Sequence, residues 1–540
     1  MPPAHAAAVR ASVEPLRELI LRFVVDGQPV EVPYAAGSLL EVLREHLRVT
    51  APKDGCSPQG QCGCCTVLVD GQPRVACVTP ARRVAGRDIR TVDGLESEVR
   101  ESWASAFTNS GASQCGFCTP GIICRLEGLR RRDGEQVLGD PVVVGRALQA
   151  HLCRCTGWRT ILEAAAAFGR GDLDGLRPLA VRDLTAAARR AEIEGGTPQK
   201  VGPDVALGRA GFADDMAPPG ALVVVPDGRG GWAAGETLQQ ARVAAGKVPG
   251  RRTSVAGWPP IDLPDGDWAR VLRTSWVEPA YLETDASWCE PGGEPASPLA
   301  NGGAFGGKLD SIVTEVARDF ADRLGRAVRV VLSREDVVRL GPKRPPMAAG
   351  LQPDGTGVVR VARTPGITEV IAQVAPKVRV EEVTIPGPPT SSRIRAAGWA
   401  ELAVLLASFT DRPGHIVAPN GAEAEAIVRS DSTIAVSVRC GDPLDEVVLR
   451  SYCIGAAHMA LSWVTSEQLA VDADGLVHDL TIRSFGVLRA VDTPAIEVHI
   501  ESSDAEPING SDAVFAAVAG AVWAYQGFPA SWPTGRSLSA

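Results

Sequence analysis

The sequence lacks three features that would place it in a broad class of protein at once. It has no excess of positive charge: Lys and Arg number 55 against 64 Asp and Glu, for a formal net charge of −9. Nucleic-acid-binding proteins normally show a basic field, so this balance argues against that class. No apolar run reaches the roughly eighteen residues that span a bilayer, so we expect no membrane segment. We also find no internal repeat and no low-complexity tract. A folded chain of 540 residues therefore remains, a length that suggests about three to five domains.

The N-terminus also lacks a targeting signal. Residues 1–17 contain small side chains but no basic stretch followed by an apolar core, and no twin arginine. This is not the pattern of a secretory signal peptide, and we expect a cytoplasmic protein. Because thiols stay reduced there, the thirteen cysteines are not expected to form a disulfide framework. Ten of them fall between Cys56 and Cys155, and clustered cysteines in an intracellular chain indicate metal or cluster ligands.

The first 171 residues predict two small domains. In residues 18–93, Asp-Gly pairs at 26–27 and 70–71 each separate two strand-like runs, which is a strong hairpin signal. Residues 38–47 have helical spacing and Ser38 as a candidate N-cap. A hairpin, a helix, a cysteine-rich loop and a second hairpin make an α+β unit. Residues 94–171 are helical in pattern; their predicted helices include 119–132, 140–152 and 160–168.

The remainder of the chain has a mixed pattern. Residues 172–198 look like a linker with one short helix. Strand-like runs, helix-like runs and Gly/Pro loops then alternate through two further parts, 199–345 and 346–540. The fold class we predict is therefore α+β and multidomain, with a mixed α/β region at the C-terminal side.

The first cysteine group is Cys56-x5-Cys62-x2-Cys65, with Cys77 after the next hairpin. A [2Fe–2S] cluster needs four thiolates, and plant-type spacing places three in one loop with the fourth further along. Four thiolates also suit tetrahedral zinc. Buried, inert cysteines are the third interpretation, but they would not explain four thiols within ten residues of a turn-rich loop.

The second cysteine group has two pairs, Cys115-x2-Cys118 and Cys153-x-Cys155. The pairs could converge if the helices at 119–132 and 140–152 pack antiparallel. Two thiolate pairs again fit either an iron–sulfur cluster or zinc. Cys124 lies inside a predicted helix, and we assign it to the core.

A glycine-rich segment at 302–308, GGAFGGK, has two interpretations. It fits part of a phosphate-cradling P-loop, but Leu309 stands where a Ser or Thr would hold Mg²⁺, and no strand-like run precedes it. We therefore reject a nucleotide site. The alternative is a backbone that approaches a bulky group closely, which glycine permits.

At the motifs CxxxxxCGxC and QCGFCTPG…LCRCTG, residues 18–170 resemble the two iron–sulfur domains of the xanthine dehydrogenase (molybdenum hydroxylase) family. The resemblance implies a β-grasp ferredoxin-like domain followed by a four-helix domain, each with one [2Fe–2S] cluster. It implies as ligands Cys56, Cys62, Cys65 and Cys77 for the first cluster, and Cys115, Cys118, Cys153 and Cys155 for the second. The family usually has four residues between its first two ligands, whereas this chain has five. Alignment on CGxCTV leaves Cys64 as an extra thiol without an assigned role.

Beyond residue 198 the resemblance is to the molybdenum-binding region of the same family. GGAFGGK resembles its GGGFGGK segment, which implies molybdopterin contacts at Gly303, Phe305 and Gly306, while Gln114 matches a position that contacts the pterin. RIRAAGWAE (393–401) is similar to the segment that carries an arginine near the substrate, here Arg395. The family's catalytic base is a glutamate in a Gly-Glu-Pro setting, and Glu506 before Pro507 occupies a comparable place.

The same region departs from the family in several ways. It has about half the usual length, Ala505 replaces the glycine before the glutamate, and no glutamine between residues 288 and 301 corresponds to the one that approaches molybdenum. There is neither room nor a motif for the FAD domain of longer members. One hypothesis is a molybdenum-dependent oxidoreductase that hydroxylates a purine-like heterocycle or an aldehyde with water. Its electrons would pass through both clusters to a FAD-binding partner subunit. The other is an electron-transfer or scaffold subunit that docks on a separate, full-length molybdenum subunit.

Overall fold

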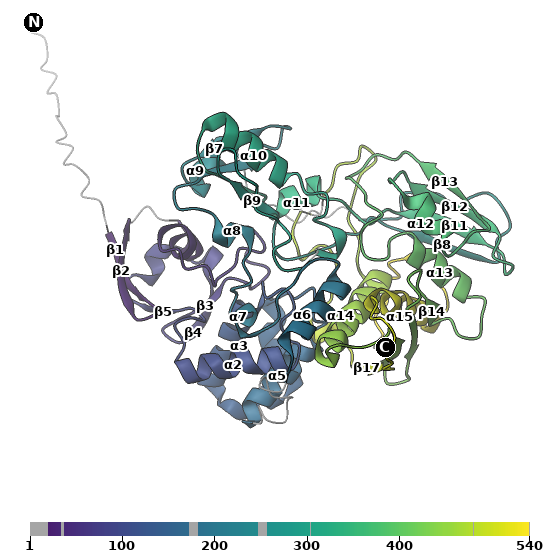
Figure 1. The fold of residues 1–540 in the computed structure, drawn as a ribbon, viewed down its shortest axis with the longest axis horizontal. Helices are drawn as coiled ribbons and strands as arrows, with labels where there is room; N and C mark the ends of the chain where they lie inside the picture. Colours follow the sequence, from purple (N-terminus) through teal and green to yellow (C-terminus); the bar gives the residue numbers. More distant parts are fainter. Residues whose placement is uncertain are drawn as a thin grey trace, which may run out of the picture.

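The computed structural model describes residues 20–33, 37–171, 182–246, 256–302, 304–478 and 480–538 (Figure 1). The predicted N-terminal tail and Gly303 lie outside the described residues. The fold is mixed, with one helical part and four sheets among the described residues.

The first domain is built on a five-stranded sheet in the order β2-β1-β5-β3-β4. Both predicted hairpins are confirmed: Asp26 and Gly27, and likewise Asp70 and Gly71, have positive φ, as the tight turns that match strand twist require. β1 and β5 pair in parallel and the other neighbours are antiparallel. The strands are β1 (Ile20–Val25), β2 (Gln28–Pro33), β3 (Thr66–Val69), β4 (Gln72–Val75) and β5 (Asp88–Arg90).

One helix covers this sheet and leads into the cysteine loop. It begins as α1 (Leu39–Glu41) and continues as a π-helical turn, η1 (Val42–His46). The predicted cap is present, because Ser38 Oγ accepts a hydrogen bond from Glu41 N at 3.2 Å. The domain is thus the β-grasp, ferredoxin-like unit that the sequence predicts.

The second domain contains four helices: α2 (Ser97–Asn109), α3 (Thr119–Asp133), α4 (Pro141–Ala147) and α5 (Arg159–Arg170). Trp103 of α2 is fully buried and stacks on Phe168 of α5 at 3.9 Å between ring centroids. Its indole N–H donates to Glu127 of α3 at 3.1 Å, so one side chain ties three helices together. The helix predicted over 140–152 is shorter than expected, because α4 ends at Ala147 and tightens into a 3₁₀ turn, η5 (Leu148–Ala150).

Two further sheets follow in the chain. The four-stranded one has the order β7-β6-β10-β9 and the five-stranded one the order β13-β12-β11-β8-β18. Their elements are α7 (Pro203–Ala206), α8 (Ala213–Met216), β6 (Leu222–Pro226), β7 (Trp232–Gly235), α9 (Leu238–Ala245), β8 (Arg270–Thr274), β9 (Ala286–Cys289), α10 (Val313–Leu324), β10 (Val328–Val331), α11 (Arg334–Leu340), β11 (Met347–Leu351), β12 (Gly357–Ala362), α12 (Ile367–Ala372), β13 (Val378–Val383) and β18 (Ser531–Trp532).

The last sheet, β14-β15-β16-β17, packs with the long apolar helices near the C-terminus (Figure 1). By length and composition α14 could cross a membrane, but 89% of its most apolar stretch is buried inside the protein, so it is packed as a core helix. Trp463 of α14 stacks on Phe515 of α15 at 5.0 Å. The elements are α13 (Trp399–Ala407), β14 (His415–Val417), β15 (Glu423–Val428), β16 (Ile434–Arg439), α14 (Glu446–Thr465), β17 (Ile496–Ile500) and α15 (Ser511–Tyr525).

The short helix predicted in the linker is α6 (Leu184–Gly195), and it is packed rather than free. Asp183 caps its first turn, and Gly196 ends it in the left-handed conformation. Ala187 and Ala191 lie against Val448 and Tyr452 of α14. This contact brings α6 to the centre of the molecule.

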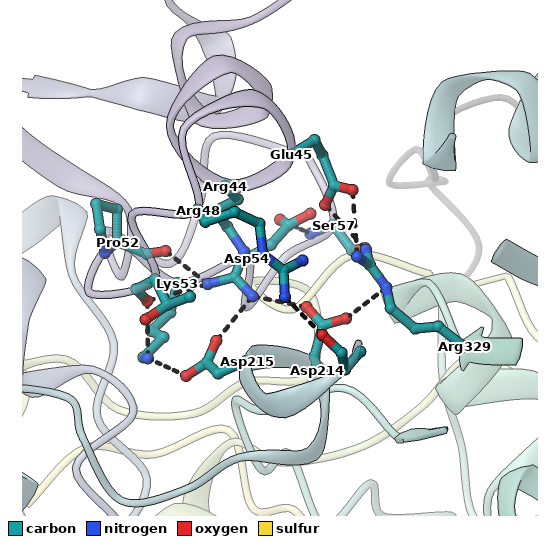
Figure 2. A network of polar contacts seen from close by, with 12 residues as sticks. Arg44, Glu45, Arg48, Pro52, Lys53, Asp54, Ser57, Asp214, Asp215 and Arg329 are labelled. Carbon is teal, nitrogen blue, oxygen red and sulfur yellow. Dashed lines mark hydrogen bonds and ion pairs between the residues drawn. The ribbon is translucent and has the colours of Figure 1, made fainter. Parts of the chain in front are cut away.

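A buried network of charges joins the ferredoxin-like domain to the region around α8 and β10 (Figure 2). Arg44 binds Asp214 at 2.7 Å and Asp215 at 2.8 Å, and Lys53 pairs with Asp215. Arg329 of β10 binds Glu45 at 2.9 Å and Asp214 at 3.0 Å. Three cations thus face three carboxylates, and such a balance is what makes burial of charge tolerable.

Candidate functional site

The structure gathers the first cysteine group around the loop that precedes β3. Cys56, Cys62, Cys65 and Cys77 are all buried. Cys56 hydrogen-bonds with Cys62 and Cys77, and Cys77 with Cys65. These thiol contacts, first of all that with Cys62, hold the pKa of Cys56 well below its usual value. Backbone amides also face the sulfurs, because Gln59 N donates to Cys56 Sγ at 3.2 Å and Cys77 N to Cys65 Sγ at 3.4 Å.

The second cysteine group meets at the start of α3, as two pairs. Cys155 Sγ lies 3.6 Å from Cys115 Sγ, and Cys118 hydrogen-bonds with Cys153. The Cys118 thiol lowers the pKa of Cys153 to about 7. Each pair therefore takes one cysteine from 115–118 and one from 153–155.

This paired arrangement suits a binuclear cluster better than a single ion. A [2Fe–2S] cluster takes four thiolates, two on each iron, whereas structural zinc draws four ligands onto one centre. Within the described residues, no three His, Cys, Asp or Glu side chains converge as a single metal ion would require. The second group thus fits a [2Fe–2S] cluster, and the first brings the same number of cysteines, all buried, into one loop region.

The two cysteine-bearing loops are in direct contact. Leu152 N donates to Cys62 O at 3.0 Å. A side chain at Gly121 of α3 would clash with the carbonyl oxygens of Gly63 and Cys64, so the two backbones touch where only glycine fits. Cys64 is fully buried at this junction, with its Sγ 3.9 Å from Cys62 O. It stays the one thiol of the loop outside the predicted ligand set.

A cavity of about 200 Å³ opens beside the second cysteine group. Its lining brings together four of the residues that the sequence singled out, namely Gln114, Phe305, Gly306 and Arg395. Cys115, Cys118 and Cys155 line the same space. Residues about 280 positions apart in the sequence therefore meet at one site beside the second cysteine group.

The glycine-rich segment bends sharply along one wall of the cavity. Ala304, Phe305 and Gly306 (η7) all have positive φ, at 50°, 55° and 87°, a conformation that is uncommon for residues other than glycine. A side chain at Gly306 would clash with Arg393 O. The bend is held because Arg395 N donates to Phe305 O at 2.9 Å, and the Arg395 guanidinium lies 5.1 Å from the Phe305 ring.

Gln114 connects the second cysteine group to α14. Its Nε2 donates to Cys155 O at 3.0 Å and to Ser451 Oγ at 2.9 Å. Asn301, on the glycine-rich side, donates through Nδ2 to Cys115 O at 3.2 Å. Polar side chains from three separate parts of the chain thus hold the backbone around the second cluster position.

Sequence reasoning missed the acidic groups of this cavity. Asp512, in the first turn of α15, pairs with Arg395 at 3.0 Å, and burial raises the pKa of its carboxyl group. Its side chain keeps 30% of its surface accessible because it faces the cavity. Glu194 of α6 also lines the cavity, but its oxygens accept from Gly510 N and Ser511 N at the start of α15. The only local signal was an Asp near a helix start.

Glu506 does not reach this site. Its side chain is 82% exposed and lies 3.5 Å from Arg189, and it is not part of the cavity lining. The loop before α15 turns it outward while Asp512 points inward. Glu506, the catalytic base that the Glu-Pro motif suggests, therefore lies outside the cavity that Phe305 and Arg395 line.

Comparison with known proteins gives sequence relatives that cover 30% or less of this chain, whereas a solved structure resembles nearly all of it. Residues 91–166 match the model of a [2Fe-2S] binding domain. A probable xanthine dehydrogenase subunit from Bacillus subtilis is 35% identical over 164 residues, which cover 92% of that protein and 30% of this chain. A nicotinate dehydrogenase subunit from Pseudomonas putida is 39% identical over 142 residues, covering 88% of that protein and 26% of this chain.

The whole chain resembles a solved structure at the level of the fold. The similarity covers 97% of this chain and 100% of the aldehyde oxidoreductase from Desulfovibrio gigas, with a TM-score of 0.65 and 14% sequence identity. It extends over the sheets and helices beyond residue 182, where the two relatives above do not reach.

Proposed function

Because the chain belongs to the xanthine dehydrogenase (molybdenum hydroxylase) family, we propose that it carries two [2Fe–2S] clusters and a molybdenum–pterin site within one electron-transfer unit. The observation that carries the proposal is the cavity whose walls include both the second cysteine group and the Phe305–Gly306 bend. A group bound there would lie beside the cluster that accepts its electrons.

The chemistry of the lining fits such a group. The first cluster would be held by Cys56, Cys62, Cys65 and Cys77, and the second by Cys115, Cys118, Cys153 and Cys155. Gln114 would accept from the pterin through Oε1, because both Nε2 hydrogens are donated to Cys155 O and Ser451 Oγ, and the backbone at Gly306 would approach the pterin closely. When bound, the molybdenum–pterin group supplies a two-electron oxidation in which water provides the oxygen.

The protein's own side chains would orient the substrate and move a proton. Arg395 faces the cavity with N–H donors that suit a carbonyl or ring nitrogen. Asp512 has a carboxyl pKa raised by burial, which makes it a better proton acceptor than an ordinary aspartate. Glu506 is the base suggested by the sequence, and separate substitution of Asp512 and Glu506 distinguishes the two carboxylates.

The proposed reaction is hydroxylation of a purine-like N-heterocycle or an aldehyde. Relatives are named for xanthine, nicotinate and aldehydes, so the family accommodates both substrate classes. Several relatives are named as subunits, which supports a multisubunit enzyme. The proposed enzyme is cytoplasmic, and a FAD-binding partner subunit takes the electrons. We propose no nucleic-acid or membrane partner.

A second candidate function is that of an electron-transfer and scaffold subunit that docks on a full-length molybdenum subunit. Two observations favour it. Glu506 is exposed, and the cavity of about 200 Å³ is smaller than the roughly 300–1,000 Å³ of typical small-molecule sites.

Metal and pterin analysis of the chain purified alone tests the proposal. About four irons with near-stoichiometric molybdenum and pterin are expected if the chain is the hydroxylase. Four irons without molybdenum would leave only the scaffold function. Zinc in place of iron would refute both.

A further inference from the structure

A second cavity, of about 320 Å³, lies between the ferredoxin-like domain and the region around α8, α9 and β10. Its volume falls within the roughly 300–1,000 Å³ of small-molecule sites. The charge network of Figure 2 forms one side, since Arg44, Glu45, Asp214 and Asp215 all line the space. It is separate from the cavity at the second cysteine group, and Glu283 lies on the wall of both.

This second cavity touches the first cluster position. Cys77, one of the four proposed ligands, is part of its wall, as are Ser57 and Pro58 of the cysteine loop. Phe117, between Cys115 and Cys118, lines it as well. A molecule bound here would contact a cluster ligand, and electron transfer is fastest over such short distances.

The cavity is open to solvent along α9. Val243 lines it and is 76% exposed, and the neighbouring lining residue Gln239 is also exposed. A small molecule could enter without displacing the domain contact.

The walls favour a flat, largely apolar molecule. Phe117 and Phe212 meet edge to face at 5.2 Å between ring centroids, and Leu40 and Leu238 also line the cavity. Aromatic edges and faces of this kind bind planar rings well.

The charges exclude a phosphate-bearing ligand. Six carboxylates line the cavity against two arginines. Arg44 is held by Asp214 and Asp215, and Arg242 lies 3.8 Å from Asp54. An anionic flavin nucleotide would therefore be repelled, whereas a neutral ring would not.

Hydrogen-bonding groups remain available for such a ring. Arg242 donates to Ser57 Oγ at 2.9 Å, but a guanidinium has five N–H donors, so it can also donate to a carbonyl oxygen. Glu283 Oε1 is a buried acceptor without a hydrogen-bond partner among the described residues. A molecule with a carbonyl that becomes a hydroxyl on reduction would match both groups.

We propose that this cavity binds a neutral quinone, which takes electrons from the first cluster. The quinone gains two electrons and two protons and becomes the hydroquinone. Each electron leaves one reduced cluster, which returns to its oxidised state, and the protons come from solvent through the open side. The inference rests on the proposed function because it needs the first cluster, and it gives the chain an acceptor besides a flavin partner.

Binding of menadione to the oxidised chain, measured by isothermal titration, is the first test. Leu238→Trp fills the cavity from α9 and should weaken binding at least tenfold. Leu324→Trp, on the exposed end of α10 and outside the cavity lining, should leave it unchanged. FMN should not bind. Equal menadione binding by both variants, or tighter binding of FMN, would overturn the assignment.

Reoxidation of the dithionite-reduced chain, followed by stopped-flow absorbance, is the second test. Menadione should reoxidise the wild-type chain and Leu324→Trp at the same rate, and Leu238→Trp at least tenfold more slowly. Ferricyanide should reoxidise all three equally. If both cluster EPR signals are present and menadione neither binds nor reacts, the inference fails and the proposed function stands. If the first cluster's signal is absent from the wild-type chain, both fail.

Discussion

The iron–sulfur part of the molecule, up to residue 171, and the larger C-terminal part beyond residue 182 preserve their expected sites to different degrees. In the iron–sulfur part, eight cysteines meet in two groups of four, and the chain covers 92% and 88% of two relatives that are 35% and 39% identical to it. In the C-terminal part, the likeness to a solved structure is one of fold, at 14% sequence identity over nearly the whole chain, and the expected glutamate faces solvent. Four cysteines can hold a cluster only if all of their sulfur atoms lie at bonding distance from iron, which restricts their positions closely. A cavity of the same shape can be lined by many different side chains.

Removal of a proposed ligand should have the largest effect. Cys65→Ser should abolish the EPR signal of the first cluster, because a [2Fe–2S] centre needs all four thiolates. Cys64→Ser, one position away and equally buried, should leave both signals. Loss of a cluster in Cys64→Ser would show that the ligand assignment in this loop is wrong.

In the C-terminal part, one added methyl group at Gly306 should prevent the molybdenum–pterin group from binding in the cavity. Gly306→Ala places a side chain against Arg393 O at a residue with φ of 87°, so we expect molybdenum and pterin to be lost while four irons remain. Gly325→Ala is the control: its φ is also positive, but a side chain there would meet nothing within 4 Å. Molybdenum retained in Gly306→Ala, measured by mass spectrometry, would exclude the bend from the site.

The two candidate bases give opposite expectations. If Asp512 moves the proton, Asp512→Asn should lower kcat about 10²–10⁴-fold, the usual contribution of a general base. Glu506→Gln should then stay within about twofold, since that side chain is 82% exposed. Steady-state turnover with iron content as the control decides between them. The reverse order would return the role to Glu506 and require the loop before α15 to turn inward.

The contact between the ferredoxin-like domain and the region around α8 and β10 can be weakened by a substitution in the buried charge network. Arg44→Met leaves Asp214 and Asp215 short of a cation, and breaking a buried network of this kind costs about 3–5 kcal/mol. Arg22→Met is the matched control, because Arg22 and its partner Glu31 are 72% and 57% exposed and an exposed ion pair contributes little to stability. Urea unfolding should separate the two variants; equal midpoints would mean that the network does not stabilise the domain contact.

Two buried histidines should make the protein acid-labile by a smaller amount. Burial lowers the pKa of His151, in the iron–sulfur part, and of His458, in the C-terminal part, to about 3. Below the ordinary histidine pKa of about 6.5 the unfolded chain binds the extra proton. Stability should therefore fall as pH drops from 6.5 towards 3, by about 1.4 kcal/mol per pH unit for each histidine.

A substitution separates the contribution of one of these histidines. His458→Gln should reduce the pH slope of the unfolding free energy between pH 6.5 and 5 by about 1.4 kcal/mol per unit. An unchanged slope in His458→Gln would mean that His458 is already protonated in the folded state.

The sequence was most informative where local chemistry dictates structure. Asp26-Gly27 gives its turn because both residues reach positive φ, and Ser38 caps its helix because its hydroxyl meets a free amide. The spacing of the cysteines was also informative, because thiols a few residues apart in a loop are held close together by the chain itself. Asp512 and Glu194 could not be found, because α6 and α15 are more than 300 residues apart in the sequence and meet only in the folded chain, where Glu194 accepts directly from the first amides of α15. Glu506 shows the converse, since a local motif does not specify which way its loop turns.

Spin quantitation of the dithionite-reduced chain by EPR tests the central claim most directly. Two [2Fe–2S] clusters in one chain predict two distinct signals that integrate to two spins per chain, with four irons bound. One spin per chain, or none with zinc bound in place of iron, would contradict the arrangement of eight cysteines as two four-thiolate sites.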